Sequence, residues 1–130
     1  MSIGALYPPL TAFAAYGAGM GSTAHNLANV LTNNFKAGRM TYGELSNRSG
    51  VRAEGPQPMG ASGPLVPYGP GLPPLQNANP AVPEGFVEGS NTDVATEMVN
   101  LIVNSRTYQA NAQTVRTADE MLGTVIDLKA

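Results

Sequence analysis

Residues 94–128, VATEMVNLIVNSRTYQANAQTVRTADEMLGTVIDL, carry the pattern that decides the fold. One set of positions recurs every seven residues and a companion set lies between them: Val94, Leu101, Tyr108, Val115 and Leu122, then Met98, Ser105, Ala112 and Ile126. A period of seven is typical of a helix that packs lengthwise on another helix. Ser90 and Asp93 match a capping box at its start. We therefore expect a helix from about Thr92 to Leu128, roughly 55 Å long.

A second helix is predicted near the N-terminus. The residues of its seam are separated by steps of three and four: Leu10, Phe13, Gly17, Met20, Ala24, Leu27 and Leu31. Pro9 suits the first turn of a helix, where the missing N–H would be unpaired in any case. The Asn33-Asn34 pair suits a chain that leaves a helix through left-handed backbone angles. The helix should therefore begin near residue 9 and end near residue 32.

This N-terminal helix is intrinsically weak. Gly17, Gly19 and Gly21 each cost about 1 kcal/mol relative to alanine in a helix. The same glycines allow other helices to approach closely. We expect the helix to order when it packs on other helices, so that its formation is coupled to assembly.

The predicted fold class is mainly α, with the N- and C-terminal helices paired as an antiparallel coiled-coil-like hairpin. The C-terminal helix would outrun its partner by roughly 20 Å. Part of its apolar stripe would then lack a partner in the same chain, and monomers rarely expose such a surface. Neighbouring subunits are the expected cover, which predicts a structural protein that assembles into a polymer.

The middle of the chain has a different composition. Nine of the eleven prolines lie between Pro56 and Pro83, and no charged residue occurs from Gly55 to Pro83. Proline fixes φ and removes a backbone donor, so residues 39–87 are expected to form an irregular or polyproline-like Pro/Gly-rich segment. The sequence leaves room for one short β-hairpin around Met40 to Glu54. The predicted domains are a helical core of residues 1–38 together with 88–130, and a middle segment of residues 39–87.

Composition argues against most other functions. The chain has 12% charged residues, a net charge of −2 and seven scattered lysines and arginines, so we expect no nucleic acid partner. Without cysteine, and with His25 as the single histidine, no metal site or cofactor is expected. No nucleotide-binding or catalytic motif occurs, which predicts no small-molecule substrate and no enzyme activity.

No membrane segment or cleaved signal is expected either. The longest mostly apolar stretch, Leu10 to Met20, is shorter than the roughly 20 residues that cross a bilayer. The first basic residue is Lys36, and Pro8-Pro9 interrupts the hydrophobic start that a secretory signal needs.

Short motifs stand near both ends of the chain. Near the N-terminus they are residues 24–29 (AHNLAN), Thr32 and Phe35-Lys36. Near the C-terminus they are four segments: residues 88–93 (EGSNTD), 97–102 (EMVNLI), 106–111 (RTYQAN) and 117–122 (TADEML). Both sets resemble the flagellar rod and hook proteins of bacteria. The two regions together cover about half of the chain and lie at its ends, as they do in that family.

The resemblance implies a subunit of the flagellar basal-body rod, the drive shaft that transmits torque from motor to hook. Such a protein is exported by the flagellar type III apparatus without a cleaved signal, and its partners are copies of itself and other axial proteins of rod and hook. The short middle segment is similar in scale to that of the proximal rod proteins. The alternative is an adaptor that binds a partner through the proline-rich residues 55–83.

The predicted assembly interface combines the helix seams with polar residues beside them. Asn26, Asn29 and Asn33 lie on one side of the N-terminal helix, and Asn104 and Asn111 are seven residues apart on the C-terminal one, where they could bond to other subunits. The full predicted interface consists of Leu10, Phe13, Gly17, Met20, Ala24, Asn26, Leu27, Asn29, Leu31, Val94, Met98, Leu101, Ile102, Tyr108, Asn111, Ala112, Val115, Leu122, Val125 and Ile126.

Overall fold

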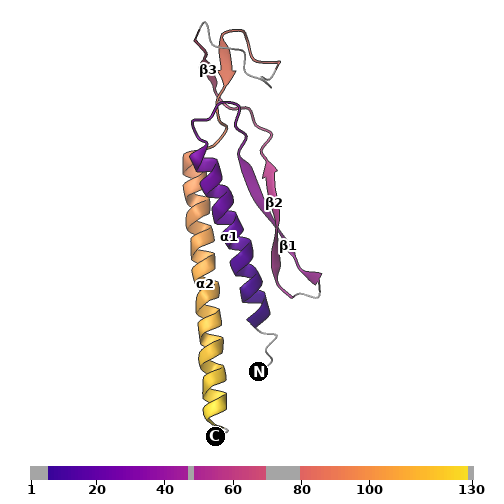
Figure 1. Ribbon diagram of the computed structural model, residues 1–130, viewed down its shortest axis with the longest axis vertical. Coiled ribbons are helices and arrows are strands. Elements are labelled where there is room, and N and C mark those ends of the chain that lie inside the picture. The colour runs from indigo at the N-terminus through magenta and orange to yellow at the C-terminus, as the bar shows by residue number, and fades with distance from the viewer. Residues whose placement is uncertain (1–5, 47–48, 70–79, 129–130) are drawn as a thin grey trace.

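A computed structural model describes residues 6–46, 49–69 and 80–128 of the chain. The molecule is long and narrow, with two helices side by side and two small sheets (Figure 1). Its elements follow in the order α1 (Tyr7–Ala28), β1 (Gly38–Glu44), β2 (Val51–Pro58), β3 (Leu65–Pro67), β4 (Phe86–Glu88) and α2 (Val94–Asp127).

Helix α1 has 22 residues, with prolines in its first turn and Asn29 as its C-cap. Pro8 and Pro9 stand in its first turn, where no intrahelical N–H bond is lost. The chain turns away after Asn29, and Asn34 takes a left-handed φ of 59°. Asparagine tolerates this region better than other non-glycine residues. Asn34 therefore makes a left-handed turn, but this turn lies five residues after the C-cap, and the helix ends at Ala28 rather than near residue 32 as predicted.

Helix α2 has 34 residues, close to the predicted span of Thr92 to Leu128. Its N-cap is Asp93, whose carboxylate accepts hydrogen bonds from the backbone N–H groups of Ala95 and Thr96. Ser90 instead bonds to Thr92, so the capping box predicted for Ser90 is replaced by a cap three residues later.

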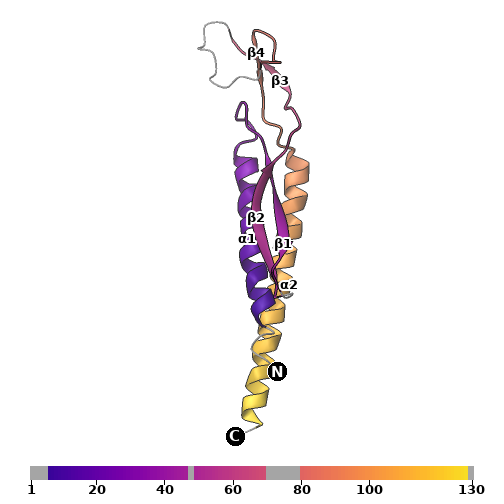
Figure 2. The same ribbon diagram turned by 90° about the vertical axis from the view of Figure 1, so that its right-hand side faces the viewer.

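The two helices run antiparallel, and α2 continues well past the N-terminal end of α1 (Figures 1 and 2). The buried stripe of α1 differs from the expected seam. It consists of Pro9, Ala12, Ala15, Gly19, Thr23 and Asn26. These side chains are small or polar, whereas Leu10 and Leu31 of the expected seam are 53% and 92% exposed. The helices therefore approach through small side chains and leave the larger apolar ones outside.

The predicted fold class, a mainly α chain with a coiled-coil-like helical hairpin, is wrong. The structure combines the two helices with two antiparallel β-sheets, β1–β2 and β3–β4. The seven-residue pattern predicts a coiled-coil core, but Val94, Met98 and Leu101 of that pattern are exposed. Instead, α1 shares its contacts between α2 and the β1–β2 hairpin (Figure 2).

The hairpin extends further than the predicted Met40 to Glu54 and includes two prolines. Strand β1 pairs with β2 from Gly38 opposite Pro58 to Glu44 opposite Val51, with a bulge between Thr41 and Tyr42. The Met59 N–H donates to Ala37 O at 2.8 Å, which makes that pair a hydrogen-bonded one. Since pair types alternate in an antiparallel ladder, Pro58 and Pro56 fall in pairs that need no cross-strand N–H. Proline spacing of two is therefore compatible with a strand, which corrects the expectation of an irregular segment here.

A second sheet pairs Leu65 with Glu88 and Pro67 with Phe86 beyond the end of the helices (Figure 1). Residues 70–79 of the proline-rich stretch lie outside the described residues.

The buried interior is thin. Its buried apolar residues, within the part of the chain that is described, are Ala12, Ala15, Ala37, Val87 and Ala118. Burial of apolar area is the main stabilising term in folding, and alanines contribute little of it. Polar contacts between the elements therefore matter more for the stability of this chain than they do where a large apolar core is present.

Candidate assembly surface and polar junction

The face of α2 that lies against the rest of the chain is polar over its first half. Glu97 is buried, and Asn100, Asn104 and Asn111 are half-buried. The Tyr42 hydroxyl donates to Asn104 Oδ1 at 3.3 Å. The apolar side chains of this half of the helix are exposed.

The exposed apolar side chains of α2 fall into two groups. The first half exposes Val94, Met98, Val99, Leu101, Ile102, Val103 and Tyr108, and the end of the helix exposes Met121, Val125, Ile126 and Leu128. Ile102 is 59% exposed and Ile126 is 68% exposed. Isolated exposed apolar residues are ordinary, but so many of them on one helix are typical of an interaction surface. We call these eleven residues the apolar surface of α2.

Aromatic contacts connect the helices and the hairpin. Phe13 and Tyr108 have ring centroids 4.7 Å apart, and Tyr16 and Tyr42 lie at 5.1 Å. Burial raises the pKa of Tyr42, and the neighbouring Tyr16 hydroxyl raises it further. Tyr42 is therefore neutral at physiological pH, and the two rings pack against each other.

The predicted interface residues of α1 and its flank fall into three classes. Leu10, Ala24 and Leu31 are exposed; Phe13, Gly17, Met20, Leu27 and Asn29 are half-buried; Asn26 is buried. The predicted residues of α2 are nearly all accessible. Val94, Met98, Leu101, Ile102, Tyr108, Ala112, Val125 and Ile126 are exposed, whereas Asn111, Val115 and Leu122 are half-buried.

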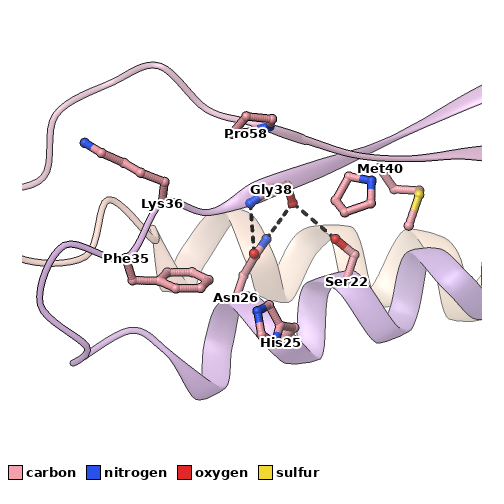
Figure 3. Close-up of a pocket in the computed structure, with 9 residues that line it drawn as sticks. Ser22, His25, Asn26, Phe35, Lys36, Gly38, Met40 and Pro58 are labelled. Carbon is pink, nitrogen blue, oxygen red and sulfur yellow. Dashed lines mark hydrogen bonds between the residues drawn. The ribbon is translucent and has the colours of Figure 1, made fainter. Parts of the chain in front are cut away.

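Asn26 lies at the centre of a buried set of hydrogen bonds. It is 2% exposed, and its side-chain oxygen accepts the Gly38 N–H at 3.0 Å. Its Nδ2 donates to Gly38 O at 2.8 Å and to Glu97 Oε1 at 2.9 Å. Figure 3 shows Asn26 and Ser22 pointing from α1 toward Gly38. One amide thus joins the end of α1, the first residue of β1 and the first turns of α2.

A second set of polar contacts lies beside the first. The Lys36 ammonium pairs with the Glu88 carboxylate, which is buried and also accepts the Gly63 N–H at 2.7 Å. Asn91 accepts the Ala37 N–H through Oδ1 at 2.6 Å, and its Nδ2 donates to Met59 O at 3.1 Å. We call Asn26, Lys36, Glu88, Asn91 and Glu97 the polar junction.

Sequence reasoning missed the polar junction. Asn26 is predicted as an assembly-interface residue, whereas the sequence predicts no buried contact for Lys36, Glu88, Asn91 or Glu97, because the period of α2 indicates apolar positions. The available signal was that buried polar residues need partners, and that polar residues concentrate in residues 24–36 and 88–97.

An open cavity of about 350 Å³ lies beside the junction and is lined by Ser22, His25, Asn26, Phe35, Lys36, Gly38, Met40, Pro56 and Pro58 (Figure 3). The rings of His25 and Phe35 meet edge to face at 5.4 Å. Across residues 6–46, 49–69 and 80–128, no group of three or more histidine, cysteine, aspartate or glutamate residues could hold a metal ion. Within the same ranges, no helix combines the length and hydropathy required to span a membrane.

Comparison with known proteins shows that part of this chain is similar to flagellar rod and hook proteins. Residues 84–128, which contain α2 and the chain leading into it, match a family model described as the C-terminal part of the flagellar basal body rod FlgEFG proteins. The chain is 49% identical over 45 residues to the flagellar hook protein FlgE of Escherichia coli K12, covering 35% of this chain and 11% of that protein.

Two further relatives extend this similarity. The flagellar basal-body rod protein FlgG of Buchnera aphidicola from Acyrthosiphon pisum is 35% identical over 88 residues, covering 65% of this chain and 32% of that protein. The flagellar hook-basal body complex protein FlhP of Bacillus subtilis is 38% identical over 47 residues, covering 36% of this chain and 18% of that protein. The matched part of the chain thus spans about a tenth to a third of the length of these relatives.

Proposed function

This chain belongs to the family of flagellar basal-body rod and hook proteins, and from that membership we propose that it is a structural subunit of the flagellar rod. Its terminal helices stack with those of neighbouring subunits into the helical drive shaft that transmits torque from motor to hook. The family is structural, and the chain is not an enzyme. The short middle segment favours a place in the proximal rod.

The apolar surface of α2 is the observation that supports this proposal most strongly. Met98, Ile102 and Ile126 are each more than half exposed in the single chain. A polymer would bury them against other subunits. Complete burial of a fully exposed apolar side chain contributes roughly 1.5–3 kcal/mol, so each of these half-exposed side chains would contribute about half of that. The predicted interface residues on α1 would supply the facing surface, with Leu10 and Ala24 already exposed.

The proposal assigns different roles to two parts of the chain. Residues 1–38 together with 88–130 form the polymerising core, and residues 39–87 form a separate middle segment. The partners are copies of this chain and other rod and hook axial proteins. Delivery occurs through the flagellar type III export apparatus without a cleaved signal, and the site of action is the rod where it crosses the periplasm.

The adaptor alternative is not favoured by the residues that the structure describes. Residues 51–58 form β2 and residues 65–67 form β3, so residues 55–58 and 65–67 of the proline-rich stretch of 55–83 are paired in sheets. A polyproline ligand needs an extended segment that is free of such pairing.

A single charge on the apolar surface tests the proposal. Ile102→Asp places a carboxylate where a neighbouring subunit would bury it, and an uncompensated buried charge is costly. We expect a loss of at least about tenfold in subunits recovered with purified basal bodies, together with loss of swimming. The isolated variant should keep its helix content, because Ile102 is 59% exposed in the single chain.

The matched control is Ser62→Asp, which adds the same charge at an exposed position of the middle segment. It should assemble and swim like the parent. Normal incorporation of Ile102→Asp would reject the proposal that this surface is an assembly interface.

A further inference from the structure

The buried apolar residues of the two helices are small, and small side chains specify the relative position of two helices poorly. They include Ala12, Ala15 and Gly19 on α1 and Ala118 on α2, within the described residues. Phe13 and Tyr108 are the large side chains that meet between the helices. Helix pairs define their relative position mainly through large side chains that fill holes in the partner. A pair with few such side chains has several positions of similar packing, each one helical turn apart.

The polar junction, in contrast, admits a single position. Asn26 satisfies three hydrogen bonds there, and Glu97 is 5% exposed with its Oε1 bonded to Asn26 Nδ2. Sliding α2 by one turn would move Glu97 about 5.4 Å along the helix axis. The Glu97 carboxylate and the Asn26 amide would then be buried without each other, which is strongly unfavourable.

The second half of the junction fixes the same position independently. Asn91 lies two residues before the N-cap of α2 and bonds to the Ala37 N–H and to Met59 O. Asn34 donates its N–H to Glu88 O at 2.7 Å, and Thr92 donates its hydroxyl to Asn26 O at 3.3 Å. The segment that leads into α2 is thereby attached to the segment that leaves α1.

We propose that the polar junction sets the register of α1 against α2, and with it the length of α2 that extends past α1. Buried polar residues are known to fix register in helix pairs at some cost in stability. Here Asn26, Asn91 and Glu97 perform this role at one end of the contact, and the apolar residues along it do not. The inference concerns the isolated chain and holds whether or not the chain enters the rod.

The test measures the axial position of the helices in the full-length chain. The chain has no cysteine, so nitroxide labels can be placed at Ala28→Cys on α1 and Gln113→Cys on α2, both exposed. The double variant Asn26→Ala with Asn91→Ala removes both halves of the junction. We expect a second distance peak, displaced by about 5 Å, in pulsed electron resonance.

Two control pairs separate register from stability. Asn29→Ala with Asn33→Ala removes two asparagines outside the junction, and Phe13→Ala with Tyr108→Ala removes the aromatic contact between the helices. Both should keep the single peak of the parent. A junction variant without a displaced peak, whether unchanged or only broader, overturns the proposal, as does a displaced peak in the aromatic variant.

Discussion

At the scale of single residues, the close contacts of this chain depend on positions where a side chain would not fit. Gly19 is such a position, because an added Cβ would press against the Tyr42 hydroxyl and lie 3.0 Å from Asn104 Nδ2. Gly17, two residues earlier, has open space around it. Gly17 and Gly19 therefore differ in the space around them, although they lie only two residues apart in the same helix.

Alanine substitutions should separate these two glycines. Gly17→Ala should stabilise the isolated chain by about 1 kcal/mol, the usual gain in helix propensity. Gly19→Ala should lose this gain, since it displaces the Tyr42 hydroxyl from Asn104 Oδ1. Urea unfolding of both variants measures the difference, and equal stabilisation would contradict the packing described here.

Asn34 provides a second residue-scale prediction. Its φ of 59° is a region that β-branched residues rarely adopt. Asn34→Gly should leave stability unchanged or slightly raised, and Asn34→Val should lower it by about 1–2 kcal/mol. Thermal unfolding of the pair gives the answer, and equal melting temperatures would show that the left-handed turn is dispensable.

At the scale of elements, the sequence predicted the helices better than it predicted their packing. The period of Val94, Leu101 and Tyr108 located α2 within two residues of its observed bounds. It could not show which face turns inward, because the buried face of α2 is built on Glu97 and half-buried asparagines. Burial there is decided by hydrogen bonds to α1 and β1, which a pattern of hydrophobicity does not record.

The hairpin was predicted shorter than it is for a related reason. Pro56 and Pro58 lowered the expectation of a strand, yet their spacing places both in pairs that require no cross-strand N–H. The sheet β3–β4 joins residues 65–67 to residues 86–88, a pairing that no local signal indicates. The polar junction also depends on long-range contacts. The sequence indicates only that buried polar groups need hydrogen-bond partners, and not which residues supply them.

The start of α2 should respond to pH. Hydrogen bonds from the Thr96 side chain and backbone lower the pKa of the Asp93 carboxyl below its ordinary value of 3.8. The ionised cap therefore contributes stability above that value, and the contribution is lost as pH falls through the lower pKa of the folded chain. Asp93→Asn keeps an N-cap side chain and should remove this dependence.

Helix content by circular dichroism between pH 5 and pH 2 measures the effect, with Asp119→Asn as the control on an exposed residue far from the cap. Identical acid transitions in the parent and in Asp93→Asn would contradict the assignment of Asp93 as the cap.

At the scale of the whole molecule, the chain has its polar groups inside and many of its apolar groups outside. Its buried apolar residues, over the described parts, are four alanines and Val87, whereas α2 exposes Met98, Ile102 and Ile126. A polymer of such chains would bury in its subunit contacts the area that a monomer usually buries in its core. The polar junction would hold each subunit in shape while those contacts form.

The most direct test of this account is the accessibility of Ile102 before and after assembly. A single cysteine at Ile102→Cys, in a chain that otherwise has none, should react with a maleimide rapidly in the isolated protein. In purified basal bodies the reaction should slow by at least about tenfold, because a neighbouring subunit covers the site, while Ser62→Cys should react at similar rates in both. Equal reactivity of Ile102→Cys in the isolated protein and in basal bodies would contradict the claim that the apolar surface of α2 is the assembly interface.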